Sequence, residues 1–169
     1  GEGQHIDMAL LDVQVSWLAN QAQNYFCSGI APTRTGEYHP NLVPYQPFPT
    51  NDGQLIIAAG NDAQYERLCH ALGLPALASD PRFATNPARV ANRALVEQLK
   101  AATQTYSSAQ LQALLRKIKV PGGPIHTIDA VFDDPQVLAR NMVVDVEHPE
   151  LGAVRTLANP IKYSATSEV

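Results

Sequence analysis

The chain has 169 residues, of which 45% are hydrophobic and 17% are charged, a composition typical of a folded domain rather than of a disordered chain. Twelve Lys and Arg residues against sixteen Asp and Glu residues leave a net charge of −4. The basic residues are scattered along the sequence, which argues against a nucleic-acid partner. The longest apolar run, Leu55 to Ala59, is far shorter than the roughly 20 residues of a membrane-spanning helix. We therefore expect no membrane partner.

Two cysteines, Cys27 and Cys69, stand far apart without a CxxC motif or paired histidines. Neither a disulfide framework nor a zinc site is indicated, and a reducing, cytoplasmic location is expected. No secretion signal is recognisable. The chain begins at Gly1 without a methionine and enters helical periodicity almost at once, so we expect a piece of a longer protein.

The first predicted element is a helix from Ile6 to Tyr25 that is apolar on more than one face. Such a helix needs partners on several sides, so we expect this segment either to self-associate or to remain detached. Residues 29–49 then hold five of the thirteen prolines and predict an extended connector.

A hairpin and a helix follow the connector. The turn residues Asn51-Asp52-Gly53 join a strand over Tyr45 to Phe48 with a buried strand over Leu55 to Ala59. Asn61 is placed to cap the next helix, with Gln64 reaching back to the Asn61 backbone amide, and Gly73 ends it.

The remaining pattern predicts more helices and a second pair of strands. Ser107 and Gln110 have capping-box spacing at the start of one helix. Two prolines around two glycines in residues 120–125 predict a rigid loop rather than a regular element. The other predicted elements are a turn at Asp80–Phe83, a helix over Ala91 to Tyr106, and strands over Met142 to Val146 and Val154 to Leu157.

The short motifs exclude several chemistries. The segment Gly1-Glu2-Gly3-Gln4 lacks the third glycine of a dinucleotide loop, and the sequence has neither a P-loop nor a hydrolase elbow. The five histidines never stand three or four residues apart, so no metal site is predicted. Asp133-Asp134 precedes Pro135 and is expected to cap a short helix rather than to act as an acid–base pair.

Four residues are candidates for substrate binding. A strand that runs into a helix at Asn61 presents backbone amides able to hold a carboxylate or a phosphate, although the charge of Asp62 opposes an anion there. A polar contact through Asn61 or Gln64 therefore stands beside the structural role of a capped helix start. Tyr45 and Gln46, between prolines, form a second candidate pair, with packing of the tyrosine ring as the alternative. No catalytic residue is predicted in the chain.

A series of short segments, taken in order, resembles the class III CoA-transferase family across essentially the whole chain. The resemblance implies an α/β (α+β) fold with a small sheet covered by about three helices. It also implies a division into the end of a large domain (1–28), a linker (29–42), a small domain (43–130) and a return linker with terminal strands (131–169). The segments are Gly1–Asp7, His39–Asn41 with Pro44-Tyr45, Thr50–Gly53, Asp80–Phe83, Val120–Pro124, Asp134–Gln136 and Asn159–Ile161.

The resemblance further implies transfer of CoA from an acyl-CoA donor to a carboxylic acid, with the CoA thioester as substrate and no tightly bound cofactor. In the transferases of this family an aspartate attacks the acyl-CoA thioester, and a mixed anhydride and then an aspartyl-CoA thioester form before the acceptor acid takes the CoA. That aspartate belongs to a segment preceding the one that matches Gly1, so we expect this chain to be inactive alone. Family members form interlocked homodimers through these linkers.

Two alternatives stay open. The same superfamily includes α-methylacyl-CoA racemases, in which an acid/base pair exchanges the α-proton. The other alternative is a non-catalytic ligand-binding or interaction module with the same architecture. The chain has no glycine-rich run between His39 and Asn61, so it is more similar to the shorter-loop members of the family than to the formyl-CoA transferase type.

Overall fold

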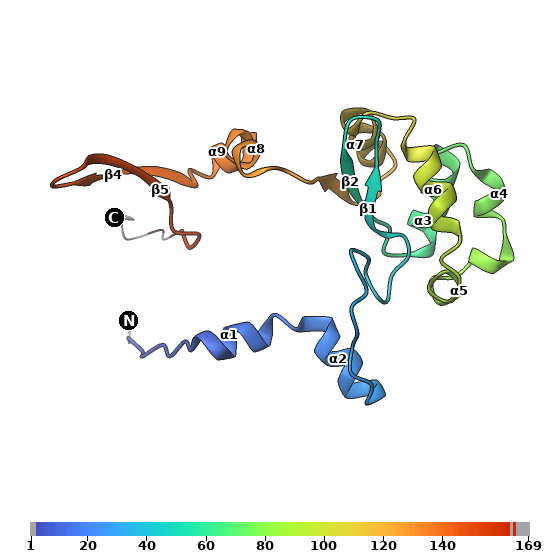
Figure 1. Cartoon of the computed structure of the whole chain (residues 1–169), viewed down its shortest axis with the longest axis horizontal. Helices are drawn as coiled ribbons and strands as arrows, with labels where there is room; N and C mark the ends of the chain where they lie inside the picture. Colours follow the sequence, from blue (N-terminus) through green and yellow to red (C-terminus); the bar gives the residue numbers. More distant parts are fainter. Residues whose placement is uncertain (1–2, 163, 165–169) are drawn as a thin grey trace. The chain divides into compact units, whose positions relative to one another are not determined.

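The computed structural model describes residues 3–162 and 164. The chain divides into two compact units, Gly1–Pro40 and Asn41–Val169. Figure 1 labels most of the helices and strands and colours the chain by position along the sequence. Each unit is described separately below.

The first unit contains two helices, α1 (Leu10–Ser16) and α2 (Ala19–Ser28), neither of which has a buried residue. The predicted single helix was wrong in its continuity. The helix is interrupted before Ala19, whose φ of 43° lies in the left-handed region that disfavours a continuous helix. Six apolar residues of this unit are each at least 72% exposed, namely Ile6, Met8, Leu10, Trp17, Phe26 and Ile30.

The second unit is built on a three-stranded antiparallel sheet in the order β1 (Tyr45–Pro49), β2 (Gln54–Ala58), β3 (Gly122–Pro124). Phe48 lies opposite Leu55 in the β1–β2 pair, and both side chains are fully buried. The predicted hairpin with its turn at residues 51–53 is therefore confirmed.

Strand β3 corrects the prediction of an irregular loop. Gly122 pairs with Ile57, and the backbone carbonyl of Pro121 accepts a hydrogen bond of 2.9 Å from the Ala58 amide. A Cβ atom on Gly122 would lie 2.6 Å from the Ile56 carbonyl oxygen and 2.6 Å from the Leu115 Cδ1 atom. The absence of a side chain at Gly122 thus allows β3 to approach β2 and α7 closely. The sequence did not predict this strand, because the flanking prolines disfavour strands.

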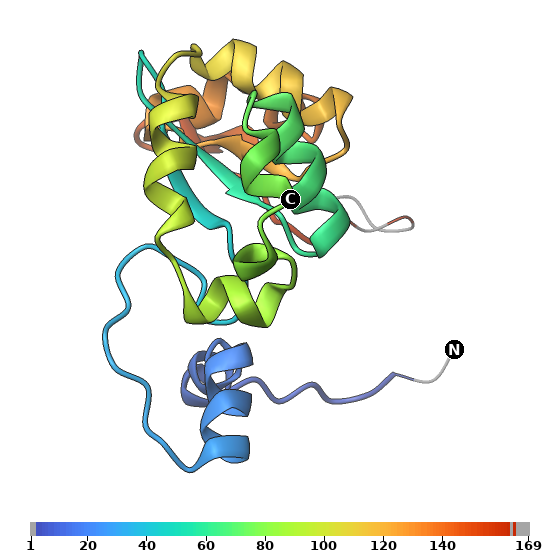
Figure 2. The same ribbon diagram turned by 90° about the vertical axis from the view of Figure 1, so that its right-hand side faces the viewer.

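Three longer helices cover this sheet, as Figure 2 shows. They are α3 (Asp62–Ala71), α6 (Leu95–Thr103) and α7 (Ser108–Lys117). Helix α6 contacts β1, and α7 contacts β2 and β3. The predicted capping box of α7 is present, with Ser107 and Gln110 in reciprocal bonds. The predicted α/β class, a small antiparallel sheet covered by helices, is confirmed.

Shorter elements connect α3 to α6. They are α4 (Pro75–Ala78), the 3₁₀ turn η1 (Pro81–Phe83) and α5 (Asn86–Ala91). The expected helix over residues 91–106 begins later, at Leu95, because α5 ends before Asn92, which has a non-helical backbone. Helix α5 was not predicted, although Thr85 caps it and Pro87 stands in its first turn.

The remainder of the second unit consists of α8 (Ile128–Asp133), α9 (Pro135–Ala139) and a hairpin of β4 (Val143–His148) with β5 (Gly152–Leu157). The Asp134 side chain accepts bonds from the Gln136 and Val137 amides, so its predicted capping role is confirmed. Each strand of the hairpin is two residues longer at its turn end than predicted.

No helix among the described residues has the length and apolar character needed to cross a membrane.

Candidate functional site

The four predicted substrate-binding residues come from one end of the three-stranded sheet. Because β1 and β2 are antiparallel, the start of β1 at Tyr45 lies opposite the end of β2 at Ala58. Asn61 follows Ala58 by three residues and caps α3. We call the start of β1, the end of β2 and the residues leading into α3 the sheet end. Tyr45, Gln46, Asn61 and Gln64 are all carried by it.

Two side-chain caps shape the start of α3. The Asn61 Oδ1 atom accepts a hydrogen bond of 2.9 Å from the Gln64 amide, and the Gln64 Oε1 atom accepts one of 2.7 Å from the Gly60 amide. The predicted donor to the Gln64 side chain was the backbone amide of Asn61. That prediction was wrong, because the donor is the backbone amide of the preceding residue, Gly60. Asn61 has an extended backbone, with φ −148° and ψ 168°, as is usual for a residue that caps a helix start.

These caps determine which polar groups remain for a ligand. Each side-chain oxygen is engaged by a backbone amide, whereas neither amide NH2 group has a hydrogen-bond partner among the described residues. An amide NH2 group only donates. Asn61 is exposed and Gln64 is half-buried. The sheet end is therefore suited to a ligand that presents acceptor oxygens, such as a carboxylate or a thioester carbonyl.

Tyr45 and Gln46 lie on opposite faces of the sheet, because successive side chains of a strand alternate. Gln46 lies opposite Ile57, on the face that also carries the buried Phe48, and it is half-buried. Tyr45 lies opposite Ala58 and is 37% exposed. A ligand on one face of the sheet would contact one member of this pair.

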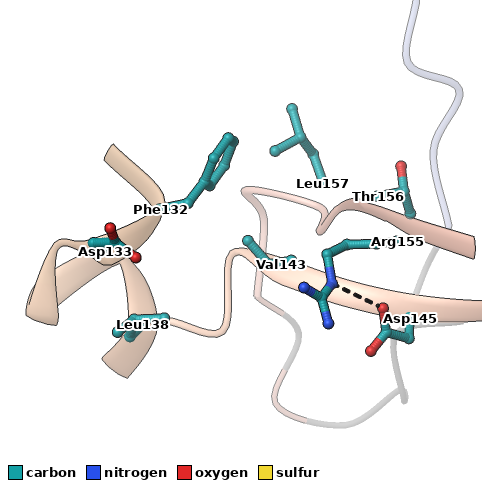
Figure 3. Close-up of a pocket in the computed structure, with 8 residues that line it drawn as sticks. All are labelled: Phe132, Asp133, Leu138, Val143, Asp145, Arg155, Thr156 and Leu157. Carbon is teal, nitrogen blue, oxygen red and sulfur yellow. Dashed lines mark hydrogen bonds and ion pairs between the residues drawn. The ribbon is translucent and has the colours of Figure 1, made fainter. Parts of the chain in front are cut away.

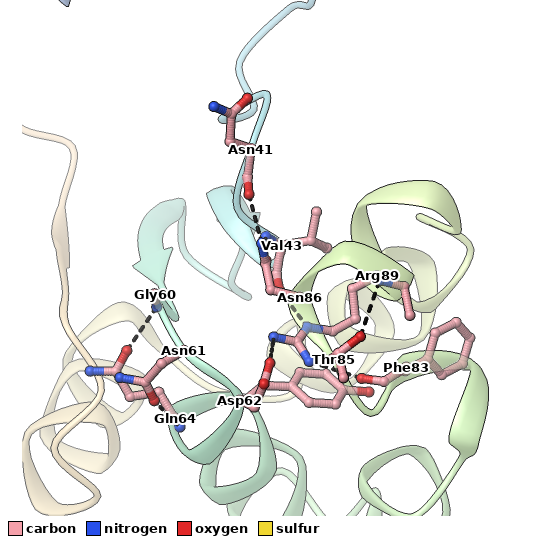
Figure 4. A network of polar contacts seen from close by, with 12 residues as sticks. Asn41, Val43, Gly60, Asn61, Asp62, Gln64, Phe83, Thr85, Asn86 and Arg89 are labelled. Carbon is pink, nitrogen blue, oxygen red and sulfur yellow. Dashed lines mark hydrogen bonds and ion pairs between the residues drawn. The ribbon is translucent and has the colours of Figure 1, made fainter. Parts of the chain in front are cut away.

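The charge of Asp62 is matched by a buried arginine that sequence reasoning missed. The Arg89 Nη2 atom lies 2.7 Å from the Asp62 Oδ1 atom; the Arg89 side chain is 0% exposed and that of Asp62 is 54% exposed. The guanidinium also stacks on the Tyr65 ring, 4.3 Å from its centroid. Figure 4 shows the Asp62–Arg89 pair beside the capped start of α3. Asp62 is thus half of an ion pair, which weakens its expected repulsion of an anion.

No pattern in the sequence marks Arg89 as buried. It occupies a short helix that was not predicted, and an arginine is ordinarily a surface residue. The only local signal is the helix start Thr85-Asn86-Pro87, which combines a cap residue with an early proline.

A hollow lies away from the sheet end, between α8, α9 and the β4–β5 hairpin (Figure 3). Its volume is about 750 Å³. The Arg155 Nε atom donates to the Asp145 Oδ1 atom at 3.1 Å, a cross-strand ion pair between directly opposed residues. None of the four predicted site residues lines it. The lining residues are Phe132, Asp133, Leu138, Val143, Asp145, Arg155, Thr156 and Leu157.

Comparisons with known proteins agree with this architecture. A sequence profile described as CoA-transferase family III matches residues 1–169. A crystal structure of a CaiB/BaiF family protein from Brucella suis is 48% identical, with a TM-score of 0.78, and the match covers 99% of this chain and 43% of that one. The chain therefore belongs to CoA-transferase family III.

Curated relatives are similar over the same range. A succinate–glutarate CoA-transferase from Agrobacterium fabrum is 48% identical over 167 residues, covering 98% of this chain and 42% of the relative. A succinyl-CoA:mesaconate CoA-transferase from Haloarcula hispanica is 39% identical and covers 98% and 42%. The chain thus spans about two fifths of the length of these relatives. Neither the racemase nor the non-catalytic module is favoured by these similarities.

Proposed function

We propose that the protein carrying this chain is a CoA-transferase that moves CoA from an acyl-CoA donor to a carboxylic acid acceptor, with CoA thioesters as substrates. The observation that supports it is the match of the family to the whole chain, together with relatives named as CoA-transferases. Succinate, glutarate and mesaconate, which appear in those names, each carry two carboxylates. We therefore infer a dicarboxylic acid as acceptor.

In this proposal the chain supplies a binding wall rather than the nucleophile. The NH2 groups of Asn61 and Gln64 donate to substrate oxygens, and Tyr45 or Gln46 forms a neighbouring contact. Pairing of Asp62 with Arg89 at 2.7 Å supports the approach of an anionic substrate, since a balanced pair repels an anion less than a lone carboxylate does. The chain alone is then expected to lack transferase activity.

The same proposal includes the organisation of the protein. Residues 1–28 belong to a large domain, 29–42 form a linker, 43–130 form the small domain and 131–169 lead back. We infer a cytoplasmic homodimer whose chains interlock through the linkers. The exposed apolar side chains of α1 and α2 support the need for a covering surface on residues 1–28.

The experiment compares transfer with proton exchange. The complete natural protein that carries this chain is incubated in deuterium oxide, once with succinyl-CoA and a dicarboxylic acid and once with a 2-methylacyl-CoA. A transferase yields the CoA ester of the added acid and leaves the α-hydrogen of the methylacyl group unexchanged. Deuterium at that carbon without any transfer would identify a racemase and overturn the proposal.

A further inference from the structure

The first turn of α5 binds backbone groups of a segment far away in the sequence. Asn86 begins this helix and Arg89 follows three residues later, so both side chains project from one face. Both reach residues 41–43, which precede β1. Val43 is fully buried at this contact, as is Arg89.

Three hydrogen bonds define the contact, and Figure 4 shows them together. The Val43 amide donates to the Asn86 Oδ1 atom at 3.1 Å, and the Asn86 Nδ2 atom donates to the Asn41 carbonyl at 2.7 Å. The Arg89 Nε atom donates to the Val43 carbonyl at 2.7 Å. If residues 41–43 were part of a sheet, the amide and carbonyl of Val43 and the carbonyl of Asn41 would all bond to one neighbouring strand. Here side chains of α5 supply those partners.

The other nitrogens of Arg89 bind two further segments. The Nη1 atom donates to the Phe83 carbonyl at 2.9 Å, and the Nη2 atom donates to Asp62 at 2.7 Å. The guanidinium therefore joins residue 43, the end of η1 and the first residue of α3. A lysine lacks this planar fork and cannot make the same three contacts. Because an unpaired buried charge is costly, the three segments are held in one arrangement.

We propose that Asn86 and Arg89 form a clamp that fixes residues 41–43 against the first turn of α3. Through Asp62, Arg89 is then a positioning residue for Asn61 and Gln64, and this second part rests on the proposed function. Arg89 is fully buried, so it acts on a ligand only through the residues that it holds. The clamp holds the chain to the second unit from Asn41 onward, just before β1 begins.

Hydrogen exchange of individual backbone amides in the full 169-residue chain tests the clamp. In Asn86→Ala the Val43 amide loses its acceptor, and we expect it to exchange about tenfold faster while the amides of β2 keep their rates. Asn86→Asp retains an acceptor and should restore protection of the Val43 amide. Arg155→Gln removes an exposed arginine–aspartate pair, 3.1 Å from Asp145 in the β4–β5 hairpin and outside the clamp, and should leave Val43 unchanged.

Two results would overturn the clamp. One is an unchanged Val43 exchange rate in Asn86→Ala. The other is acceleration of the β2 amides by the same factor, which would mean general destabilisation rather than release of residues 41–43.

Kinetics of the complete natural protein test the positioning role. In Arg89→Lys we expect KM for succinyl-CoA or for the dicarboxylic acid to rise about tenfold, with a smaller change in kcat. The hydrogen-exchange rates of the β2 amides should stay unchanged. Asn86→Ala serves as the milder variant if Arg89→Lys does not fold, with the same direction of change. An unaltered KM in a folded variant that has lost Val43 protection would overturn the positioning role. Absence of transfer in the unsubstituted protein would instead count against the proposed function, and the exchange result would stand separately.

Discussion

The carboxylate of Asp52, in the turn between β1 and β2, accepts hydrogen bonds from the backbone amide of Ser108 at 2.8 Å and from its hydroxyl at 2.7 Å. Ser108 begins α7, so the turn of the hairpin is tied to the start of that helix. These bonds favour the charged carboxylate and hold the pKa of Asp52 below its usual value. An anion at a helix start is also favoured by the helix dipole.

The first prediction concerns stability against pH. Because the folded pKa of Asp52 is lowered, its stabilisation is present in full above the unfolded pKa of about 3.9 and is lost as pH falls through the folded value. We expect Asp52→Asn to be less stable than the unsubstituted chain at pH 7 and equally stable at the acidic end. Urea unfolding at a series of pH values measures this.

Ser108→Ala provides the matched control for that series. It removes the hydroxyl donor and keeps the amide donor, so its pH dependence should lie between those of the other two proteins. A constant stability difference between Asp52→Asn and the unsubstituted chain at all pH values would contradict the role of this carboxylate.

The second prediction concerns the close approach of β3 to β2. Gly122→Ala places a Cβ atom 2.6 Å from a backbone oxygen of β2, which has little freedom to move. We expect a loss of about 1–3 kcal/mol in the free energy of unfolding, typical of an overpacked core. Gly123→Ala meets no atom within 4 Å and should change stability by less than about 0.5 kcal/mol. Equal effects of the two substitutions in thermal unfolding would refute this explanation.

The third prediction concerns the two thiols. Cys69 is fully buried beside Tyr65, and burial raises its pKa to about 11, whereas Cys27 is exposed. Only the thiolate reacts with an alkylating agent, so at pH 8 one thiol per native chain should react and the second only on unfolding. Cys27→Ser should abolish the fast reaction. Two thiols reacting at the same rate in the native chain would contradict this packing of α3.

The fourth prediction separates the two roles of Asn61. Asn61→Ser retains a side-chain oxygen that caps α3, so stability should change by only a few tenths of a kcal/mol. The same change removes the amide NH2 group. In the complete protein we expect KM for the substrate to rise about three- to tenfold through loss of one hydrogen bond. Steady-state kinetics and thermal unfolding together measure both effects, and an unchanged KM would exclude Asn61 from the site.

How far the sequence predicts this structure differs from element to element. The β1–β2 hairpin and the start of α7 follow from local signals, since turn residues and a capping box act within a few positions. Strand β3 could not be predicted in this way. Its pairing depends on the missing side chain of Gly122 and on Ile57, which is remote in sequence.

The candidate site shows the same division. Asn61 was expected at the start of α3 because capping is local, and it lies there. The neutralising partner of Asp62 was not expected, because Arg89 is 27 residues away and its burial depends on the packing of Tyr65 and Val43 around it. The binding roles of Tyr45, Gln46, Asn61 and Gln64 remain predictions.

The most direct test of the central claim is the fate of CoA in one reaction. The complete natural protein is mixed with succinyl-CoA and glutarate, and all CoA species are separated by chromatography and identified by mass. The proposed function predicts glutaryl-CoA in an amount equal to the succinate released, with no free CoA. Formation of free CoA and succinate without glutaryl-CoA would show hydrolysis instead and would contradict the assignment as a transferase.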